Sequence, residues 1–267
     1  MTLRKYFIVT LLPLLLVGCG PYQQILKSKD PDYKFQMALE YFNDKQYVKS
    51  QTLLDDVAAY FKGTDRAQDV LIYLSRSYMG QKNYSSAADY YDAYIRNYPK
   101  GQYITEAQFQ VGHCYYLDSP DARLDQEITR KSIDYLTQFI ELYPESPYSE
   151  QAYKELNEMY DKLAYKEFLS AKLYYNLGTY LGNNYLSAEI VAKNALKNYP
   201  SNSYQEDLSW IIFISKYQQM VNSVDSKMAE RTQEAEDEFF SFKTEYPNSK
   251  HMAQAERYYK DIQKHKK

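Results

Sequence analysis

Hydrophobic positions along this chain follow two patterns, one continuous and one periodic. Residues 6–17 form an apolar run, whereas the rest of the chain mixes apolar and polar positions at helical spacing. One stripe with the spacing i, i+3, i+4, i+7 consists of Leu71, Leu74, Ser75 and Tyr78. This spacing places the four side chains on one face of a helix. The pattern therefore predicts a short N-terminal apolar segment followed by amphipathic helices.

Four short motifs of one form divide the helical part into repeats. They are NYPKGQY (97–103), LYPESPY (142–148), NYPSNSY (198–204) and EYPNSKH (245–251). Proline has no N–H to continue a helix and disfavours helix in the residue before it, so each Tyr-Pro predicts a helix end. A small residue precedes each of these prolines by twelve positions, and a degenerate first unit ending at 58–64 has one in the same place: Ala87, Ser132, Ala188, Ala235 and Ser50.

The repeats predict an all-α fold, an α-solenoid of about five helical hairpins with a C-terminal capping helix. The predicted hairpins are 33–44 with 47–61, 67–80 with 84–98, 103–117 with 129–143, 166–181 with 184–198, and 203–222 with 230–245. An additional helix is predicted at 149–163, an insertion at 117–132, and a polar capping helix at 249–265. The predicted organisation is a removed signal (1–18), a lipidated tether (19–31), an N-terminal half (32–146) and a C-terminal half (147–267). The tether has no clear periodicity, and at about 3.5 Å per residue it reaches at most ~40 Å.

The N-terminus has the layout of an export signal. Arg4 and Lys5 precede the apolar run, which is too short to span a bilayer as a mature helix. The sequence LVGC at 16–19 resembles the bacterial lipobox, which implies removal of residues 1–18 and acylation of Cys19. Such an anchor holds a protein stably at a membrane. Gly20 is not the aspartate that retains some lipoproteins in the inner membrane, so the outer membrane of a Gram-negative bacterium is expected. A plain secretory signal with a chance cysteine is the alternative.

Composition narrows the function classes. Once the signal is removed, 249 residues remain (267 minus 18), and the formal net charge of the whole chain is −3. Without a basic excess, nucleic-acid binding is not expected. The chain has two cysteines, Cys19 and Cys114, so no disulfide framework is expected, and Cys114 is predicted to be a buried, unreactive side chain.

Candidate catalytic chemistry is sparse. The three histidines, His113, His251 and His265, are scattered without metal-ligand spacing, and no glycine-rich phosphate loop or nucleophile elbow is present. We therefore expect no catalytic residues, no metal and no cofactor, and look for function in a binding surface.

The repeat spacing resembles the tetratricopeptide repeat, a helix–turn–helix unit of 34 residues. Carried across residue by residue, the family pattern places a peptide-binding groove on the first helix of each of three units. The groove positions are Phe35, Leu39 and Phe42, then Ile72, Arg76 and Met79, then Phe109, His113 and Tyr116. This groove would suit an extended peptide with aromatic side chains, with Arg76 facing a carboxylate. The alternative is that several of these aromatics pack between repeats.

A lipobox, a short tether and five tetratricopeptide-like units with Tyr-Pro ends together resemble the BamD family. The family element D-Q-x-x-T is matched by DQEIT, Asp125 to Thr129. The resemblance implies a non-catalytic scaffold of the β-barrel assembly (BAM) complex, anchored at the periplasmic face of the outer membrane. Its C-terminal units, roughly 166–245, would hold a POTRA domain of the barrel protein BamA, and its N-terminal units would bind unfolded outer-membrane β-barrel proteins.

Two other classes share parts of this pattern. One is a tetratricopeptide lipoprotein adaptor for cell-wall or secretion machinery, which has the same fold and a different client. The other is a nutrient-binding lipoprotein of the SusD kind, which needs a large extra carbohydrate-binding region. No part of this sequence remains unassigned to supply that region, so the second class is disfavoured.

Overall fold

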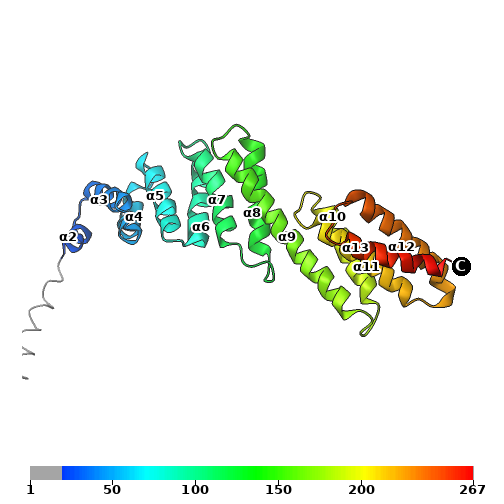
Figure 1. Ribbon diagram of the computed structural model, residues 1–267. Coiled ribbons are helices and arrows are strands. Elements are labelled where there is room, and N and C mark those ends of the chain that lie inside the picture. Colours follow the sequence, from blue (N-terminus) through cyan, green and yellow to red (C-terminus); the bar gives the residue numbers. More distant parts are fainter. Residues whose placement is uncertain (1–19, 267) are drawn as a thin grey trace, which may run out of the picture. The chain divides into compact units, whose positions relative to one another are not determined.

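A computed structural model describes residues 20–266, and its regular elements within that range are all helices. They are α2 (Pro21–Lys27), α3 (Pro31–Asn43), α4 (Tyr47–Phe61), α5 (Arg66–Gly80), α6 (Tyr84–Asn97), α7 (Ile104–Asp118), α8 (Glu127–Leu142), α9 (Ser149–Leu177), α10 (Asn184–Asn198), α11 (Gln205–Val221), α12 (Asp225–Glu245), α13 (Met252–Ile262) and the 3-10 turn η2 (Gln263–His265). The all-α prediction is therefore confirmed, and the order of the helices is shown in Figure 1.

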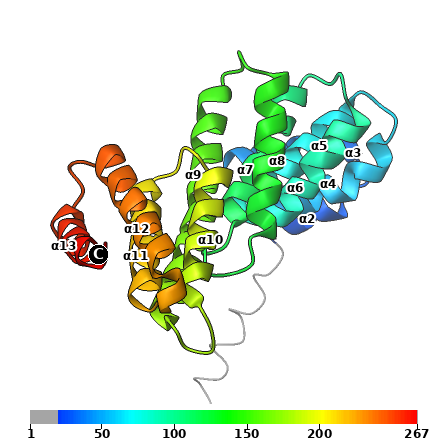
Figure 2. The same cartoon turned by 90° about the vertical axis from the view of Figure 1, so that its right-hand side faces the viewer.

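The described chain divides into two compact units. Unit 1 comprises residues 20–118 with 134–152, and unit 2 comprises 119–133 with 153–266. Helices α8 and α9 each contribute residues to both units. Within unit 1, α3 to α7 each pack on the next helix in the sequence, and within unit 2 the same holds for α10 to α13. Figures 1 and 2 show both runs of neighbouring helices.

Small residues lie where the paired helices approach each other. All five that the repeat spacing identified are fully buried: Ser50, Ala87, Ser132, Ala188 and Ala235. A small side chain keeps the two backbones close, so that larger neighbours can interdigitate around the contact. In unit 1 the neighbours of Ala87 include the buried rings of Tyr91 and Tyr94. The small residue twelve positions before each repeat-ending proline therefore marks a buried contact between helices.

Each Tyr-Pro motif ends a helix. In the four motifs the tyrosine N–H donates the last helical hydrogen bond, from Tyr98 to Tyr94, Tyr143 to Phe139, Tyr199 to Ala195 and Tyr246 to Phe242, at 2.8–2.9 Å. The following proline has no N–H to donate, so the helix cannot continue. At the other end of two helices, Asn83 and Asn183 accept hydrogen bonds from the backbones of Ser86 and Leu186. These caps begin α6 and α10 at equivalent places in their repeats.

Two elements differ from the sequence-based expectation. The helices predicted at 149–163 and 166–181 are one continuous helix, α9, because no glycine or proline lies between them to end the first. The segment expected to act as a short tether contains α2, whose Ile25 is buried in a core cluster with residues of α3, α4 and α5. Tyr22 of α2 also packs edge-on against Tyr41, with 5.5 Å between ring centroids. Helix α2 is therefore folded onto unit 1.

Candidate interaction surfaces

The predicted lipid anchor lies outside the described residues, which begin at Gly20, one position after Cys19. None of the helices between residues 20 and 266 is long and apolar enough to cross a membrane. In the same range, no group of three or more His, Cys, Asp or Glu side chains is placed to hold a metal ion.

Three of the nine predicted groove residues lie in the core of unit 1. Phe35, Ile72 and Phe109 are all buried. Phe35 packs edge-on against Phe61 at 5.8 Å between ring centroids, and Phe109 stacks on Tyr148 at 4.9 Å. The expectation that these three line an open groove is therefore corrected. Each of these helices packs against neighbours on more than one side, so positions outside its predicted buried stripe also contact other helices instead of solvent.

Arg76, the single cation expected in the groove, already has a carboxylate partner. Its Nε lies 2.7 Å from Oε1 of Glu106, and its Nη2 lies 2.5 Å from Oε2. The guanidinium also lies over the rings of Tyr73 and Tyr103, at 5.1 and 5.0 Å from their centroids. Burial acts to lower the pKa of Arg76, but the hydrogen bonds and the charge of Glu106 outweigh it and raise that pKa. Arg76 therefore has a structural role in unit 1, where it binds Glu106.

The other five predicted groove residues, Leu39, Phe42, Met79, His113 and Tyr116, are half-buried. Phe42 contacts the ring of Tyr73 edge-on at 5.2 Å. On α7, His113 is stacked between Phe109 and Tyr116, at 5.4 and 6.0 Å between centroids. These five positions therefore keep part of their surface accessible, and three of the five carry aromatic rings.

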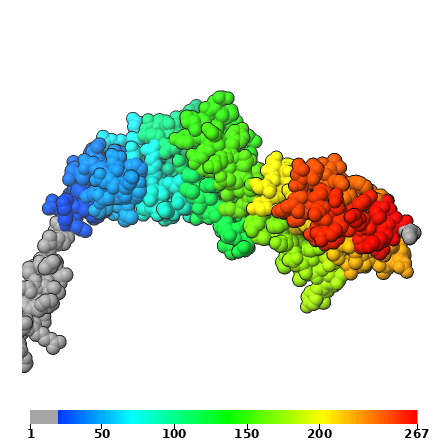
Figure 3. Space-filling view, in the orientation of Figure 1, coloured from blue at the N-terminus to red at the C-terminus, as the bar shows by residue number. Residues whose placement is uncertain are grey.

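Unit 2 carries an exposed apolar surface that sequence reasoning did not identify. We name it the α9–α10 surface, and it consists of Leu173, Leu177, Tyr180, Leu181, Leu186 and Ile190. Leu181 is 91% exposed and has a positive φ of 56°, a backbone conformation that is rare for a bulky residue. The six exposed apolar side chains belong to one helical hairpin and lie within eighteen residues of sequence. Exposed apolar side chains that gather on one part of a protein mark interaction sites. Figure 3 shows the end of α9 and the loop after it, in yellow-green, at the surface of the unit.

The sequence did hold a signal for this surface. Leu173 and Leu177 on α9, and Leu186 and Ile190 on α10, are pairs at i, i+4 that lie off the buried stripes of their helices. A second apolar stripe on a helix indicates a second packing face.

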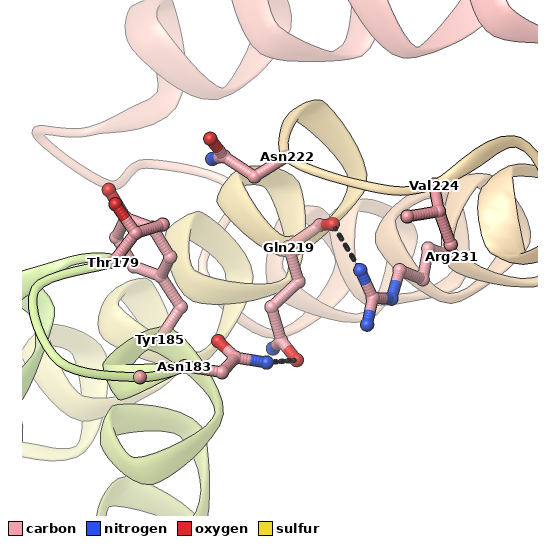
Figure 4. A pocket seen from close by; sticks show the side chains of 8 residues that line it. Thr179, Asn183, Tyr185, Gln219, Asn222, Val224 and Arg231 are labelled. Atoms are coloured by element: carbon pink, nitrogen blue, oxygen red, sulfur yellow. Dashed lines mark hydrogen bonds between the residues drawn. The ribbon is translucent and has the colours of Figure 1, made fainter.

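A pocket of about 360 Å³ lies beside this surface, between the α9–α10 loop and the α11–α12 turn. Figure 4 shows Asn183 and Arg231 reaching Gln219 from opposite sides. The Asn183 amide donates to Oε1 of Gln219 at 3.4 Å, and Nη1 of Arg231 donates to the Gln219 carbonyl at 3.1 Å. Since Asn183 also caps α10, these bonds hold the loop that carries Leu181.

The DQEIT element has a structural role in unit 2. Gln126 is fully buried, and its amide donates to the carbonyls of Asp121 and Leu124 at 2.8 and 3.1 Å. Its Oε1 accepts a hydrogen bond from Thr129 at 2.6 Å. Lys162 of α9 donates to Ser119 Oγ at 2.7 Å, and burial lowers the pKa of Lys162. The element therefore folds the 119–126 loop and fixes it to α9.

Comparisons with known proteins give a family and two distant structural likenesses. No curated protein matches the chain. Among solved structures, tetratricopeptide-like repeats of a Podospora anserina kinesin light chain show 12% identity and a TM-score of 0.39, covering 83% of this chain and 100% of that one. A human IFIT1 dimer with PPP-AAAA shows 17% identity and a TM-score of 0.29, covering 87% of this chain and 59% of that one.

The family match is of a different kind, because it covers more than half of the chain. The model of the YfiO family, described as outer membrane lipoprotein, matches residues 27–182. The matched region contains the first three hairpins, the DQEIT element and all of α9. The chain belongs to the YfiO family of outer membrane lipoproteins, the family of BamD.

Proposed function

We propose that this protein is a non-catalytic scaffold of the β-barrel assembly machinery, lipid-anchored through Cys19 at the periplasmic face of the outer membrane. The observation that carries the proposal is the α9–α10 surface, a set of six exposed apolar side chains on one hairpin of a helical-repeat protein from an outer-membrane lipoprotein family. Leaving six large apolar side chains in contact with water is unfavourable unless a partner covers them. In a stable complex, a scaffold protein keeps its partner bound, so these apolar side chains are covered by the partner and not by water.

The partner proposed for this surface is a POTRA domain of a BamA-like barrel protein. The surface lies within residues 166–245, the C-terminal region in which the resemblance to the BamD family leads us to expect that contact. Leu181 stands at its tip, and the bonds around Gln219 fix the loop before any partner arrives. A pre-formed loop loses little conformational entropy on binding, which favours a stable contact.

The half-buried aromatic positions of unit 1 are proposed to bind unfolded barrel proteins. Phe42, His113 and Tyr116 keep part of their rings accessible, whereas the buried groove positions support them from below. Aromatic rings favour other aromatic rings in offset or edge-on contacts, so strands rich in aromatic residues are the client class. Arg76 has no part in this proposal because Glu106 already pairs with it.

The test is site-specific crosslinking in cells, followed by identification of the captured protein. A photoreactive residue at position 181 is compared with one at position 60, since Tyr60 is a 66% exposed residue of unit 1 that lies outside both proposed surfaces. We expect position 181 to capture a BamA-like barrel protein and position 60 not to do so. Capture of only cell-wall or secretion proteins at position 181 would instead indicate the adaptor class and overturn the proposal.

A further inference from the structure

Another pocket of unit 2 has aromatic walls and shares no lining residue with the α9–α10 surface. It has a volume of about 230 Å³, and it is lined by α9, α11 and the residue that begins α13. We name it the Trp210 pocket after the one tryptophan of the chain, which is 8% exposed. Its ring walls come from Phe168, Tyr175, Trp210 and His251, and Ile211 and Ile214 complete the apolar lining.

The walls are held in place by contacts within the protein. Trp210 stacks face to face on His251, with 4.5 Å between ring centroids and 3° between planes. His251 is held in turn by Asp207, whose Oδ1 lies 3.4 Å from its Nε2 and 2.8 Å from Nζ of Lys250. The carboxylate of Asp207 therefore has two partners of its own. The pocket is pre-organised, so little conformational entropy of its side chains is lost when a ligand binds.

Size and wall chemistry favour an aromatic side chain as the occupant. A cavity of about 150 Å³ lined by apolar side chains is large enough to bind benzene. The Trp210 pocket exceeds that volume, so a phenyl or phenol ring fits. Aromatic rings attract each other in offset and edge-on geometries beyond the effect of area alone. Rings from three separate elements allow several such contacts at once.

Charge at the edge of the pocket favours a carboxylate beside that ring. Lys172 is an exposed lining residue, and its Nζ lies 5.8 Å from the centroid of the Phe168 ring. Within residues 20–266 it forms no ion pair. Since Lys250 neutralises Asp207, the positive charge of Lys172 is the uncompensated one at this site. An unpaired ammonium beside an apolar pocket attracts an acidic group.

We propose that the Trp210 pocket binds an acidic peptide segment, taking one aromatic side chain into the pocket and pairing a neighbouring Asp or Glu with Lys172. The aromatic ring provides most of the affinity through burial, and the carboxylate fixes the direction of the segment. This site goes beyond the scaffold role proposed above. Because its test contains no barrel protein, it can fail while the scaffold role stands.

The experiment uses the full lipidated protein in detergent and reads the fluorescence of Trp210, which is the only tryptophan. The probe is an acetylated, amidated hexapeptide with Phe-Glu at its centre, and matched peptides carry Ala for Phe or Lys for Glu. We expect a saturable change in emission with the Phe-Glu peptide and binding at least about tenfold weaker with the Ala peptide. The Lys peptide is expected to bind roughly two- to fivefold more weakly, as is typical of an exposed ion pair.

Variants assign the charge contact to one lysine. Lys172→Ala should weaken binding of the Phe-Glu peptide roughly two- to fivefold and should not weaken binding of the Lys peptide, whose charge Lys172 repels. Lys154→Ala is the matched control, because Lys154 is an exposed lysine of the same helix and should have no effect. Equal binding of the Phe and Ala peptides, or no emission change at millimolar peptide, would overturn the proposal. Equal losses from Lys172→Ala and Lys154→Ala would overturn the assignment of the acidic group.

Discussion

Arg76 on α5 and Glu106 on α7 form a two-pronged ion pair that joins successive repeats of unit 1. Both side chains are largely buried, and the two N–O distances are 2.7 and 2.5 Å. A guanidinium matches a carboxylate in this geometry better than an ammonium does. The repeat pattern predicts that Arg76 binds a peptide. In the structure Arg76 instead joins α5 to α7, which belong to successive repeats.

Breaking this pair should destabilise the protein. Arg76→Met leaves Glu106 with its charge in a largely buried place, so we expect the free energy of unfolding to fall by about 2 kcal/mol. Replacing both residues, as Arg76→Met with Glu106→Gln, should restore part of the loss because no uncompensated charge remains. Urea unfolding followed by circular dichroism measures both effects. A loss below about 0.5 kcal/mol for Arg76→Met would mean that the pair behaves like an exposed one.

Cys114 should be chemically inert in the native protein. It is fully buried beside Met79, and burial raises the pKa of its thiol to about 12. Only the thiolate reacts with disulfide reagents, so both access and ionisation oppose reaction. In a Cys19→Ser variant, where Cys114 is the sole thiol, we expect no labelling at pH 8 over hours and complete labelling in urea. Rapid labelling of the folded variant would contradict the burial of Cys114 between α7 and its neighbouring helices.

Gln126 should control the order of the 119–126 loop. Gln126→Ala removes three hydrogen bonds made by a fully buried side chain, to Asp121, Leu124 and Thr129, so a loss of about 2 kcal/mol is expected. Hydrogen exchange of residues 119–133 should rise more than that of α11. Arg123→Ala serves as the control, since Arg123 is exposed in the same loop. If both variants exchange alike, the DQEIT element does not hold the loop.

Stability should depend on the ionisation of Asp207. Burial acts to raise the pKa of Asp207, but hydrogen bonds from Lys250 and His251 outweigh it, and the pKa lies below its usual value. A carboxyl with a lowered folded-state pKa stabilises the fold above its unfolded pKa, about 3.9, and loses that effect as the pH falls further. The advantage of wild type over Asp207→Asn should therefore shrink between about pH 4 and pH 2. An advantage that grows over that range would have the wrong sign.

The local features of this fold could be predicted from sequence, and the contacts between repeats could not. Tyr98 and Tyr199 end helices because the following proline acts on its own neighbours, and Ala87 and Ala188 are small because the partner helix is close in sequence. Whether Phe35 faces solvent or core depends instead on how a whole helix is rotated in the stack, which no short pattern determines.

Arg76 and the α9–α10 surface were also not predicted correctly from the sequence. Arg76 lies at a groove position in the repeat pattern, but its partner is thirty residues away, at Glu106. The α9–α10 surface was missed because groove positions were assigned only to the first three repeats, and α9 and α10 lie after them. The predicted helix 166–181 already places Leu173 and Leu177 on the face opposite the buried Ala171.

Changing the tip of the α9–α10 surface tests the contact without threatening the fold. Leu177 and Leu181 are exposed, and aspartate tolerates the left-handed backbone of position 181 better than leucine does. We expect the double variant Leu177→Asp with Leu181→Asp to unfold within about 0.5 kcal/mol of wild type, as exposed substitutions do. A much larger loss of stability would show that these leucines are needed for folding rather than for a partner.

The most direct measurement is copurification of the lipidated protein from solubilised outer membranes, comparing wild type, the Leu177→Asp with Leu181→Asp variant, and Tyr60→Asp as a control. We expect a BamA-like barrel protein to be recovered with wild type and with Tyr60→Asp, and its recovery to fall at least about tenfold with the double variant. Recovery of no barrel protein with wild type, or equal recovery with the folded double variant, would contradict it.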